Sequence, residues 1–140
     1  MNVSYCQSEL QIAYYHYAKF STIMTYEDSE TLPQLPDLGF YYHYKHDLTG
    51  AVNNYAYEVI GVGYHTEDDC RPIDQYMVQY RPLYDAFVYR IGKRRLNDAR
   101  PLSMFMEEVT KDGITKDRFT RITDPKILSE LTAIRDKMYS

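Results

Sequence analysis

The fold is decided by residues 40–64, FYYHYKHDLTGAVNNYAYEVIGVGY, where two runs of aromatic and β-branched residues flank a segment rich in turn-forming residues. Tyr, Phe, Val and Ile favour β-strands, whereas Gly, Asp and Asn favour turns. The same alternation continues along the chain, so five short strands are expected, at residues 40–45, 55–64, 74–81, 86–91 and 94–99. This region therefore predicts an antiparallel, mainly β domain.

A hairpin is the clearest local signal after these first strands. In FVYRIGKRRL, residues 87–96, Gly92 and Lys93 stand between two candidate strands, and glycine at the first central position favours a type II′ turn. The following RPLSMFMEEV is too apolar for a loop, and a single helical turn docked by Leu102 and Phe105 is expected there.

The C-terminal stretch TDPKILSELTAIRDKMYS predicts an amphipathic α-helix after a last strand at 114–121. Asp124 is a good N-cap residue, and Pro125 suits the first helical position because no amide hydrogen is needed there. Apolar residues recur at helical spacing and form one stripe, made of Ile127, Leu128, Leu131, Ile134 and Met138.

The first 38 residues have a different character. Residues 8–24 fit a helix by their apolar spacing, although their β-branched and aromatic content would also suit a strand. Acidic residues followed by Pro33 and Pro36 then favour an extended connector. We expect three parts: an N-terminal extension with a connector (1–38), a β domain (39–122) and a C-terminal helix (123–140).

Bulk composition limits the classes of function. A chain of 140 residues with a net charge of −4 fits one domain and argues against a protein that coats nucleic acid over its whole surface. Two distant cysteines, Cys6 and Cys70, argue against a disulfide framework. Neither a secretion signal nor a membrane-spanning run is present, which favours a soluble, cytoplasmic protein with no membrane partner. The 16 tyrosines suit a contact surface, including that of a homodimer.

Five sequence blocks occur in an order that points to a known family. They read Tyr41-Tyr42-His43-Tyr44-Lys45, Tyr57-Glu58-Val59, His65-Thr66-Glu67, Tyr80-Arg81-Pro82-Leu83-Tyr84 and Arg100-Pro101-Leu102-Ser103-Met104-Phe105. Through these blocks, residues 39–122 resemble the bacterial domain of unknown function family 1653. The resemblance implies a small SH3-like antiparallel β-barrel and assigns no biochemical function. The chain departs from the family pattern at Asn97-Asp98-Ala99, where a tryptophan is expected.

The polar members of these blocks are candidates for a ligand site. A curved sheet can bring aromatic faces and basic groups together, so that rings stack on a planar ligand and Lys or Arg pairs with its carboxylate or phosphate. The alternative is a structural network in which Glu58 pairs with Arg81 or Arg100 inside the domain. The candidate ligand-binding residues are His43, Lys45, Glu58, His65, Tyr80, Arg81, Tyr84 and Arg100.

The preferred hypothesis is a non-enzymatic binding module for a small anionic, nucleotide-like ligand or for a protein partner, without a cofactor. No metal site is expected, because His43 and His46 fall on opposite faces of a strand and the spacing of His and Cys shows no convergent group of ligands.

Two other functions stay open at this point. A basic hairpin with aromatic residues can follow phosphates and stack on bases, which gives an RNA- or DNA-binding alternative with Tyr89, Arg90, Lys93, Arg94 and Arg95. A small hydrolase or transferase could use His65 and Glu67 as acid and base, although an ordinary solvated turn explains these two residues equally well.

Overall fold

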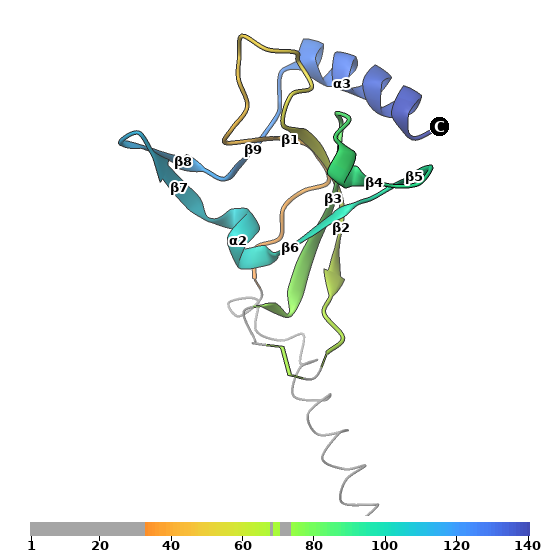
Figure 1. The fold of residues 1–140 in the computed structure, drawn as a ribbon. Helices are drawn as coiled ribbons and strands as arrows, with labels where there is room; N and C mark the ends of the chain where they lie inside the picture. Colours follow the sequence, from red (N-terminus) through yellow and green to blue (C-terminus); the bar gives the residue numbers. More distant parts are fainter. Residues whose placement is uncertain (1–32, 68, 71–73) are drawn as a thin grey trace, which may run out of the picture. The chain divides into compact units, whose positions relative to one another are not determined.

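A sheet of five short strands carries the fold, together with two hairpins and a C-terminal helix (Figure 1). The computed structural model describes residues 33–67, 69–70 and 74–140. In chain order the elements are β1 (Gly39–His43), β2 (Ala56–Tyr64), β3 (Tyr76–Pro82), η2 (Phe87–Tyr89), β4 (Arg90–Ile91), β5 (Arg94–Arg95), β6 (Asp98–Pro101), α2 (Leu102–Met106), β7 (Glu108–Lys111), β8 (Ile114–Asp117), β9 (Phe119–Arg121) and α3 (Pro125–Met138).

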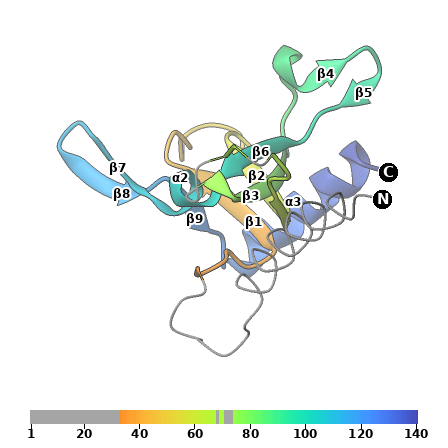
Figure 2. The same cartoon turned by 90° about the horizontal axis from the view of Figure 1, so that it is seen from below.

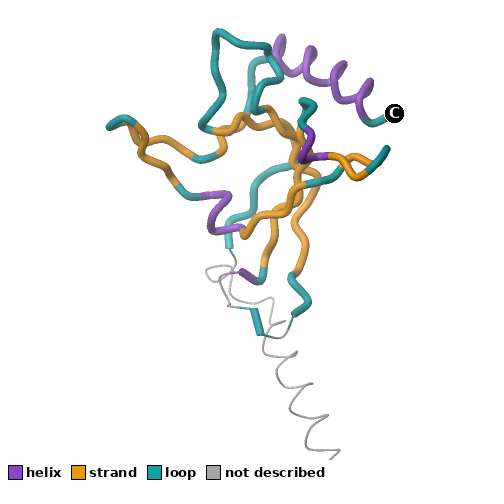
Figure 3. The backbone as a smooth tube through the Cα atoms, in the orientation of Figure 1, coloured by secondary structure: helices purple, strands orange, loops and turns teal. Residues whose placement is uncertain are grey.

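The main sheet has the strand order β6-β3-β2-β1-β9, and every neighbouring pair is antiparallel. The register of β2 against β3 shifts between Val59 and Gly61, and such an irregularity bends a strand. The remaining strands form two separate ribbons, β4–β5 and β7–β8, which extend away from the sheet in different directions (Figures 2 and 3).

Because side chains alternate along each strand, the sheet has two apolar faces, and a different helix packs against each of them. One face packs against the short helix α2, through the buried side chains of Leu102 and Phe105. The opposite face packs against α3, whose Leu131 is fully buried. The first face contributes Tyr41, Tyr57, Val59, Val78, Tyr80 and Phe119, and the second face contributes Phe40, Ala56 and, with the adjoining segments, Leu83 and Ile122.

Helix α3 begins as the sequence predicts. The Asp124 carboxylate accepts hydrogen bonds from the amides of Lys126 and Ile127, at 2.9 and 3.1 Å, and Pro125 occupies the first turn. At the other end, the Tyr139 hydroxyl donates a hydrogen bond to the carbonyl of Pro82, the last residue of β3. The helix is therefore fastened to the sheet at its C-terminal end as well as through its apolar stripe.

The prediction of a mainly β fold with a C-terminal helix is confirmed. In the described residues, however, the strands form three sheets that do not close on one another, so the SH3-like barrel is not confirmed. The predicted strands 40–45, 55–64 and 74–81 correspond to β1, β2 and β3. The predicted helix at 8–24 lies outside the described residues.

Three predicted elements differ from the structure. The strand expected at 86–91 begins as a 3₁₀ turn, because the Tyr89 amide bonds back to the Ala86 carbonyl at 3.0 Å. The strand expected at 94–99 is interrupted between β5 and β6, and the one at 114–121 is split at Arg118 into β8 and β9. The breaks between β5 and β6 and between β8 and β9 each mark a change of pairing partner, which strand propensity does not encode.

Candidate functional site

His43, the last residue of β1, lies among aromatic rings on the face that packs against α2. The centroid of its ring is 4.4 Å from that of Tyr44 and 5.0 Å from that of Phe119. The rings of Tyr55 and Tyr57 follow at 6.1 and 6.4 Å. Within the described part of the chain, the buried Nδ1 of His43 has no hydrogen-bond partner. This environment favours the neutral imidazole.

Positive charge gathers around the same imidazole. Lys45 Nζ lies 5.9 Å from the centroid of the Tyr44 ring, and the Arg118 guanidinium lies 5.8 Å from the same centroid. The Arg100 guanidinium lies 5.9 Å from the Phe119 centroid. Both of these rings contact His43, so cations from three segments of the chain reach its surroundings.

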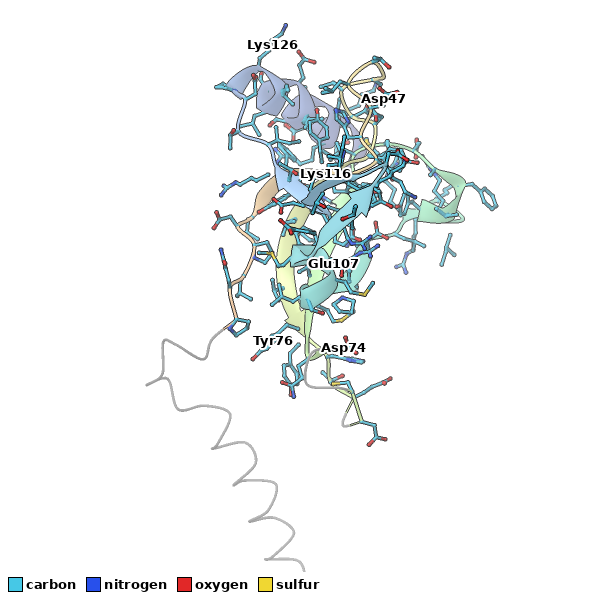
Figure 4. The ribbon with its side chains drawn as sticks, turned by 90° about the vertical axis from the view of Figure 1, so that its left-hand side faces the viewer. Asp47, Asp74, Tyr76, Glu107, Lys116 and Lys126 are labelled. Carbon is cyan, nitrogen blue, oxygen red and sulfur yellow. The ribbon has the colours of Figure 1, made fainter. Side chains whose placement is uncertain are left out.

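Burial and these cations both lower the pKa of His43. Burial is the larger cause, and the charges of Arg100, Lys45, Arg118 and Lys116 add to it, lowering the pKa of His43 to about 4. Lys116 belongs to β8, on the β7–β8 ribbon (Figure 4). At pH 7 the imidazole is therefore neutral and does not add to the local positive charge.

Carboxylates balance little of this charge. Arg118 donates from Nε to Glu107 Oε1 at 2.8 Å. Arg100 donates from Nε to the Tyr80 hydroxyl at 3.1 Å, which fixes its side chain without neutralising it. Among the residues that the structure describes, neither Arg100 nor Lys45 nor Lys116 forms an ion pair. Glu107 and the nearby Asp98 offset part of this charge, and Lys45 and Lys116 leave the His43 surroundings net positive.

Three tyrosine hydroxyls meet beside this region. Tyr57 and Tyr84 share a short hydrogen bond, and the Tyr89 hydroxyl lies 3.5 Å from each of the other two. Burial is the main reason that the pKa values of Tyr57 and Tyr89 lie well above the ordinary value. Tyr57 and Tyr89 are therefore protonated at neutral pH, and their hydroxyl groups can take part in hydrogen bonds beside the aromatic rings.

Asp98 on β6 adds a carboxyl group at the edge of this face. It is paired in register with Tyr80, two residues from Arg100. Burial raises the pKa of Asp98, while a hydrogen bond from Tyr89 and the charge of Arg100 lower it in part. Its Oδ2 atom is buried and has no partner in the described residues. Asp98 thus belongs to the polar cluster rather than to the exposed surface.

Two of the predicted ligand-binding residues lie on the opposite face of the sheet. Arg81 donates from Nε to Glu58 at 2.7 Å, and Arg135 of α3 donates to the same carboxylate at 3.0 Å. The guanidinium of Arg81 also lies 4.2 Å from the centroid of the Tyr139 ring. Glu58 and Arg81 therefore form the internal ion pair that the sequence left as an alternative.

His65 lies beyond the end of β2, in a turn. Its Nε2 is 3.7 Å from Glu67 Oε2, and the Glu67 side chain is 80% exposed. The His65 amide donates to the Gln75 carbonyl at 2.7 Å, which closes the turn between β2 and β3. A long contact to an exposed carboxylate is typical of a solvated turn, whereas the Nδ1 atom of His65 is buried and has no hydrogen-bond partner in the described residues.

The basic hairpin is partly neutralised at its base. Arg90 and Arg95 both bind the Asp85 carboxylate, at 3.0 and 2.6 Å. At the turn of the hairpin, Lys93 and Arg94 form no ion pair with any residue that the structure describes. Tyr89, the aromatic residue of this segment, points its hydroxyl to Tyr57 and Tyr84.

The structure thus brings together four of the eight predicted ligand-binding residues on one face and adds residues that the sequence did not single out. His43, Tyr80, Tyr84 and Arg100 share the face, with Lys45 beside it. Strand alternation could have indicated Tyr57, Lys116 and Arg118, since each falls on a strand predicted from the sequence. Asp98 could not have been found, because its importance depends on the pairing of β6 with β3.

His46 is separated from His43, as the sequence predicts. Its ring stacks on Tyr42 at 3.5 Å, and its Nδ1 donates to the Asn54 carbonyl at 2.7 Å. The described residues contain no group of three or more His, Cys, Asp or Glu side chains that could hold a metal ion. No helix within the same residues is long and apolar enough to cross a membrane.

The fold and the site define a small β-sheet domain with an aromatic, positively charged face. A family model described as a protein of unknown function (DUF1653) matches residues 39–121, more than half of the chain, and the protein belongs to this family. The resemblance carried by the five sequence blocks is thereby confirmed. No curated protein and no solved structure matches the chain.

Proposed function

We propose that this protein is a non-enzymatic binding module for a small anionic, nucleotide-like ligand, held at the His43 surroundings. The observation that carries the proposal is a set of cations near His43. Each of these cations lies close to an aromatic ring that itself contacts the neutral imidazole. Lys45 and Arg118 lie over Tyr44, and Arg100 lies over Phe119. An anion bound here would offset positive charge that the described carboxylates leave unbalanced.

Arg100 is the expected principal contact of the anionic group. Its Nε is held by the Tyr80 hydroxyl, so the planar guanidinium is oriented before a ligand arrives. A preoriented guanidinium loses little entropy on binding and suits the geometry of a phosphate or carboxylate. Lys45 and Lys116 are exposed and add charge without fixed geometry.

Exposed aromatic side chains are the reason for expecting a planar base in the ligand. The Tyr55 ring is 39% exposed, and its centroid is 5.8 Å from that of Tyr84. A planar base can stack on an exposed ring of this kind, and base–aromatic stacking contributes roughly 1–3 kcal/mol. Charge and stacking together favour a phosphate ester of a planar molecule over a bare anion.

Native mass spectrometry of the freshly purified protein is the first test. A ligand of nucleotide size that is released on denaturation is the expected result. Nucleotide titrations followed by NMR then locate the site, because an anion near His43 stabilises the imidazolium and raises the pKa of this residue from about 4.

Two variants make the test specific. Arg100→Gln removes the charge but keeps a polar side chain, and we expect at least a tenfold loss of affinity, since one charge-assisted hydrogen bond is worth roughly 1.5–3 kcal/mol. Lys126→Gln on α3 is the matched control, because Lys126 is exposed and lies on a different element (Figure 4). Equal affinities of the two variants, or no binding of any nucleotide to the intact chain, would refute the proposal.

A further inference from the structure

The segment formed by η2 and the β4–β5 hairpin exposes three large apolar side chains. Phe87 is 95% exposed, Val88 71% and Ile91 68%. We call these three residues the apolar tip; Phe87 and Val88 lie in η2 at the start of the hairpin, and Ile91 lies next to its turn. Single exposed apolar residues are common, but three within five positions concentrate exposed apolar surface on one segment, as interaction surfaces do.

Charge is distributed unevenly along the same hairpin. At its base, Asp85 binds both Arg90 and Arg95. At its turn, Lys93 and Arg94 form no ion pair with any described residue. The strand pairing sets Arg94 directly opposite Ile91, so an unbalanced cation lies beside the apolar tip.

The hairpin is held in place before any partner binds. The Leu96 amide donates to the Tyr89 carbonyl at 2.8 Å, and Gly92 has the positive φ of +60° that the turn requires. Tyr89 also packs its ring on that of Tyr84, at 5.8 Å between centroids. Insertion of the apolar tip would therefore cost little ordering entropy.

We propose that the apolar tip inserts into an anionic lipid surface, with Lys93 and Arg94 at the level of the headgroups. Apolar side chains gain free energy at the boundary between headgroups and acyl chains, and adjacent basic residues bind anionic headgroups. This inference is independent of the ligand at His43. It departs from the sequence-based expectation of no membrane partner, because the exposure of Phe87 and Val88 cannot be read from the sequence.

Size and composition favour lipid over the other partners of an exposed hairpin. A stable protein interface buries ~800 Å² on each side. The apolar tip comprises three side chains, whereas each side of such an interface contains roughly 20–30 residues. Nucleic acid is also a poor match, because two of the three side chains, Val88 and Ile91, are aliphatic and cannot stack on bases as aromatic rings do.

Vesicle sedimentation with the full chain tests this proposal. We expect binding to vesicles of mixed phosphatidylcholine and phosphatidylserine to exceed binding to pure phosphatidylcholine by about 25-fold, since each of the two basic residues near an anionic surface contributes about fivefold. Replacing Phe87, Val88 and Ile91 together with Ser should abolish the binding. The double change Lys93→Gln and Arg94→Gln should remove the preference for phosphatidylserine.

Matched controls distinguish binding through the apolar tip from nonspecific binding to vesicles. Ile114→Ser changes an apolar residue that is 65% exposed on the other ribbon, and Lys126→Gln with Lys137→Gln removes two exposed charges from α3. All control variants should bind vesicles like the intact chain. The thermal midpoint of each variant verifies the fold, and Phe87→Ser alone replaces the triple variant if the latter unfolds.

Three results would overturn the proposal. They are an intact chain that does not sediment with mixed vesicles, vesicle binding that the Phe87 variants leave unchanged, and equal losses for Ile114→Ser and the tip variants. A tip variant that loses affinity for single-stranded RNA oligonucleotides while vesicle binding persists would assign the hairpin to nucleic acid instead.

Discussion

Arg135 of α3 donates a hydrogen bond to the Glu58 carboxylate of β2 at 3.0 Å, across 77 positions of the sequence. The same carboxylate accepts a second hydrogen bond from Arg81 of β3 at 2.7 Å, and only 13% of the Glu58 side chain is exposed. One acidic residue thus joins two strands and the helix that covers them.

Glu58→Gln should lower the free energy of unfolding by about 2 kcal/mol, because the Arg81 guanidinium loses its counter-charge and Arg135 keeps only its ion pair with Asp136. Urea unfolding monitored by circular dichroism measures this change. Glu108→Gln, at an exposed position of β7, should change stability by less than about 0.5 kcal/mol. Equal stability of the two variants would mean that the ion pairs of Glu58 add nothing to the free energy of unfolding.

Leu131→Ala should destabilise the protein by about 2–4 kcal/mol, because this side chain is fully buried between α3 and the sheet and its removal leaves a cavity. Leu48→Ala, at a position that is 91% exposed, is the matched control and should be nearly neutral. A small effect of Leu131→Ala in the same urea experiment would show that α3 does not pack firmly on the sheet.

Acidification should destabilise the fold through His43. Its pKa is about 4 in the folded state and 6.5 when exposed, so between these pH values the unfolded chain binds the extra proton. Stability is therefore complete above about pH 6.5 and falls as the pH drops toward 4.

Because His43 is only half-buried, we expect a loss of about 1–3 kcal/mol between pH 7 and pH 4 from this residue. Urea unfolding of the intact chain and of His43→Gln, at a series of pH values, isolates the contribution. If both proteins lose stability in parallel, other groups cause the acid sensitivity.

Alkaline pH should act through the tyrosine hydroxyls. Burial holds the pKa of Tyr57 and of Tyr89 above the ordinary value of 10.0, so the folded state keeps protons that the unfolded chain releases. Their contribution to stability is present below pH 10 and is lost as the pH rises further. Tyrosine ionisation followed by ultraviolet absorbance should therefore show a group of hydroxyls that ionises only when the protein unfolds.

Tyr57→Phe should reduce the late-ionising group by one and cost about 1 kcal/mol, because the hydrogen bond to Tyr84 is lost. Tyr64→Phe is the control, since Tyr64 is 54% exposed. A single transition for all tyrosines, well below the unfolding pH, would contradict the buried hydroxyl cluster.

Local signals in the sequence predicted the elements whose formation depends on neighbouring residues. The Asp124 cap, the Pro125 start, the Gly92 turn and the first three strands follow from rules that act over a few positions. Elements that depend on long-range pairing were predicted less well, and the strand expected at 94–99 divides because β5 pairs with β4 whereas β6 pairs with β3.

The residues of the candidate site were likewise predicted poorly wherever their position depends on long-range contacts. Strand alternation separated His43 from His46, but it could not place Glu58 and Arg81 against a helix at the far end of the chain. Residues chosen as one polar set therefore divide between two faces. Asp98 entered the site only through its position opposite Tyr80 in a neighbouring strand.

The packing of α3 changes what counts as one folding unit in this family. The family match ends at residue 121, yet Leu131 fills the space over Phe40, Ala56 and Leu83, all of which lie within the match. The segment recognised by sequence thus leaves one apolar face of its own sheet uncovered. In this chain the cover comes from α3, which lies outside the match, so a fragment cut at residue 121 would expose that face to solvent.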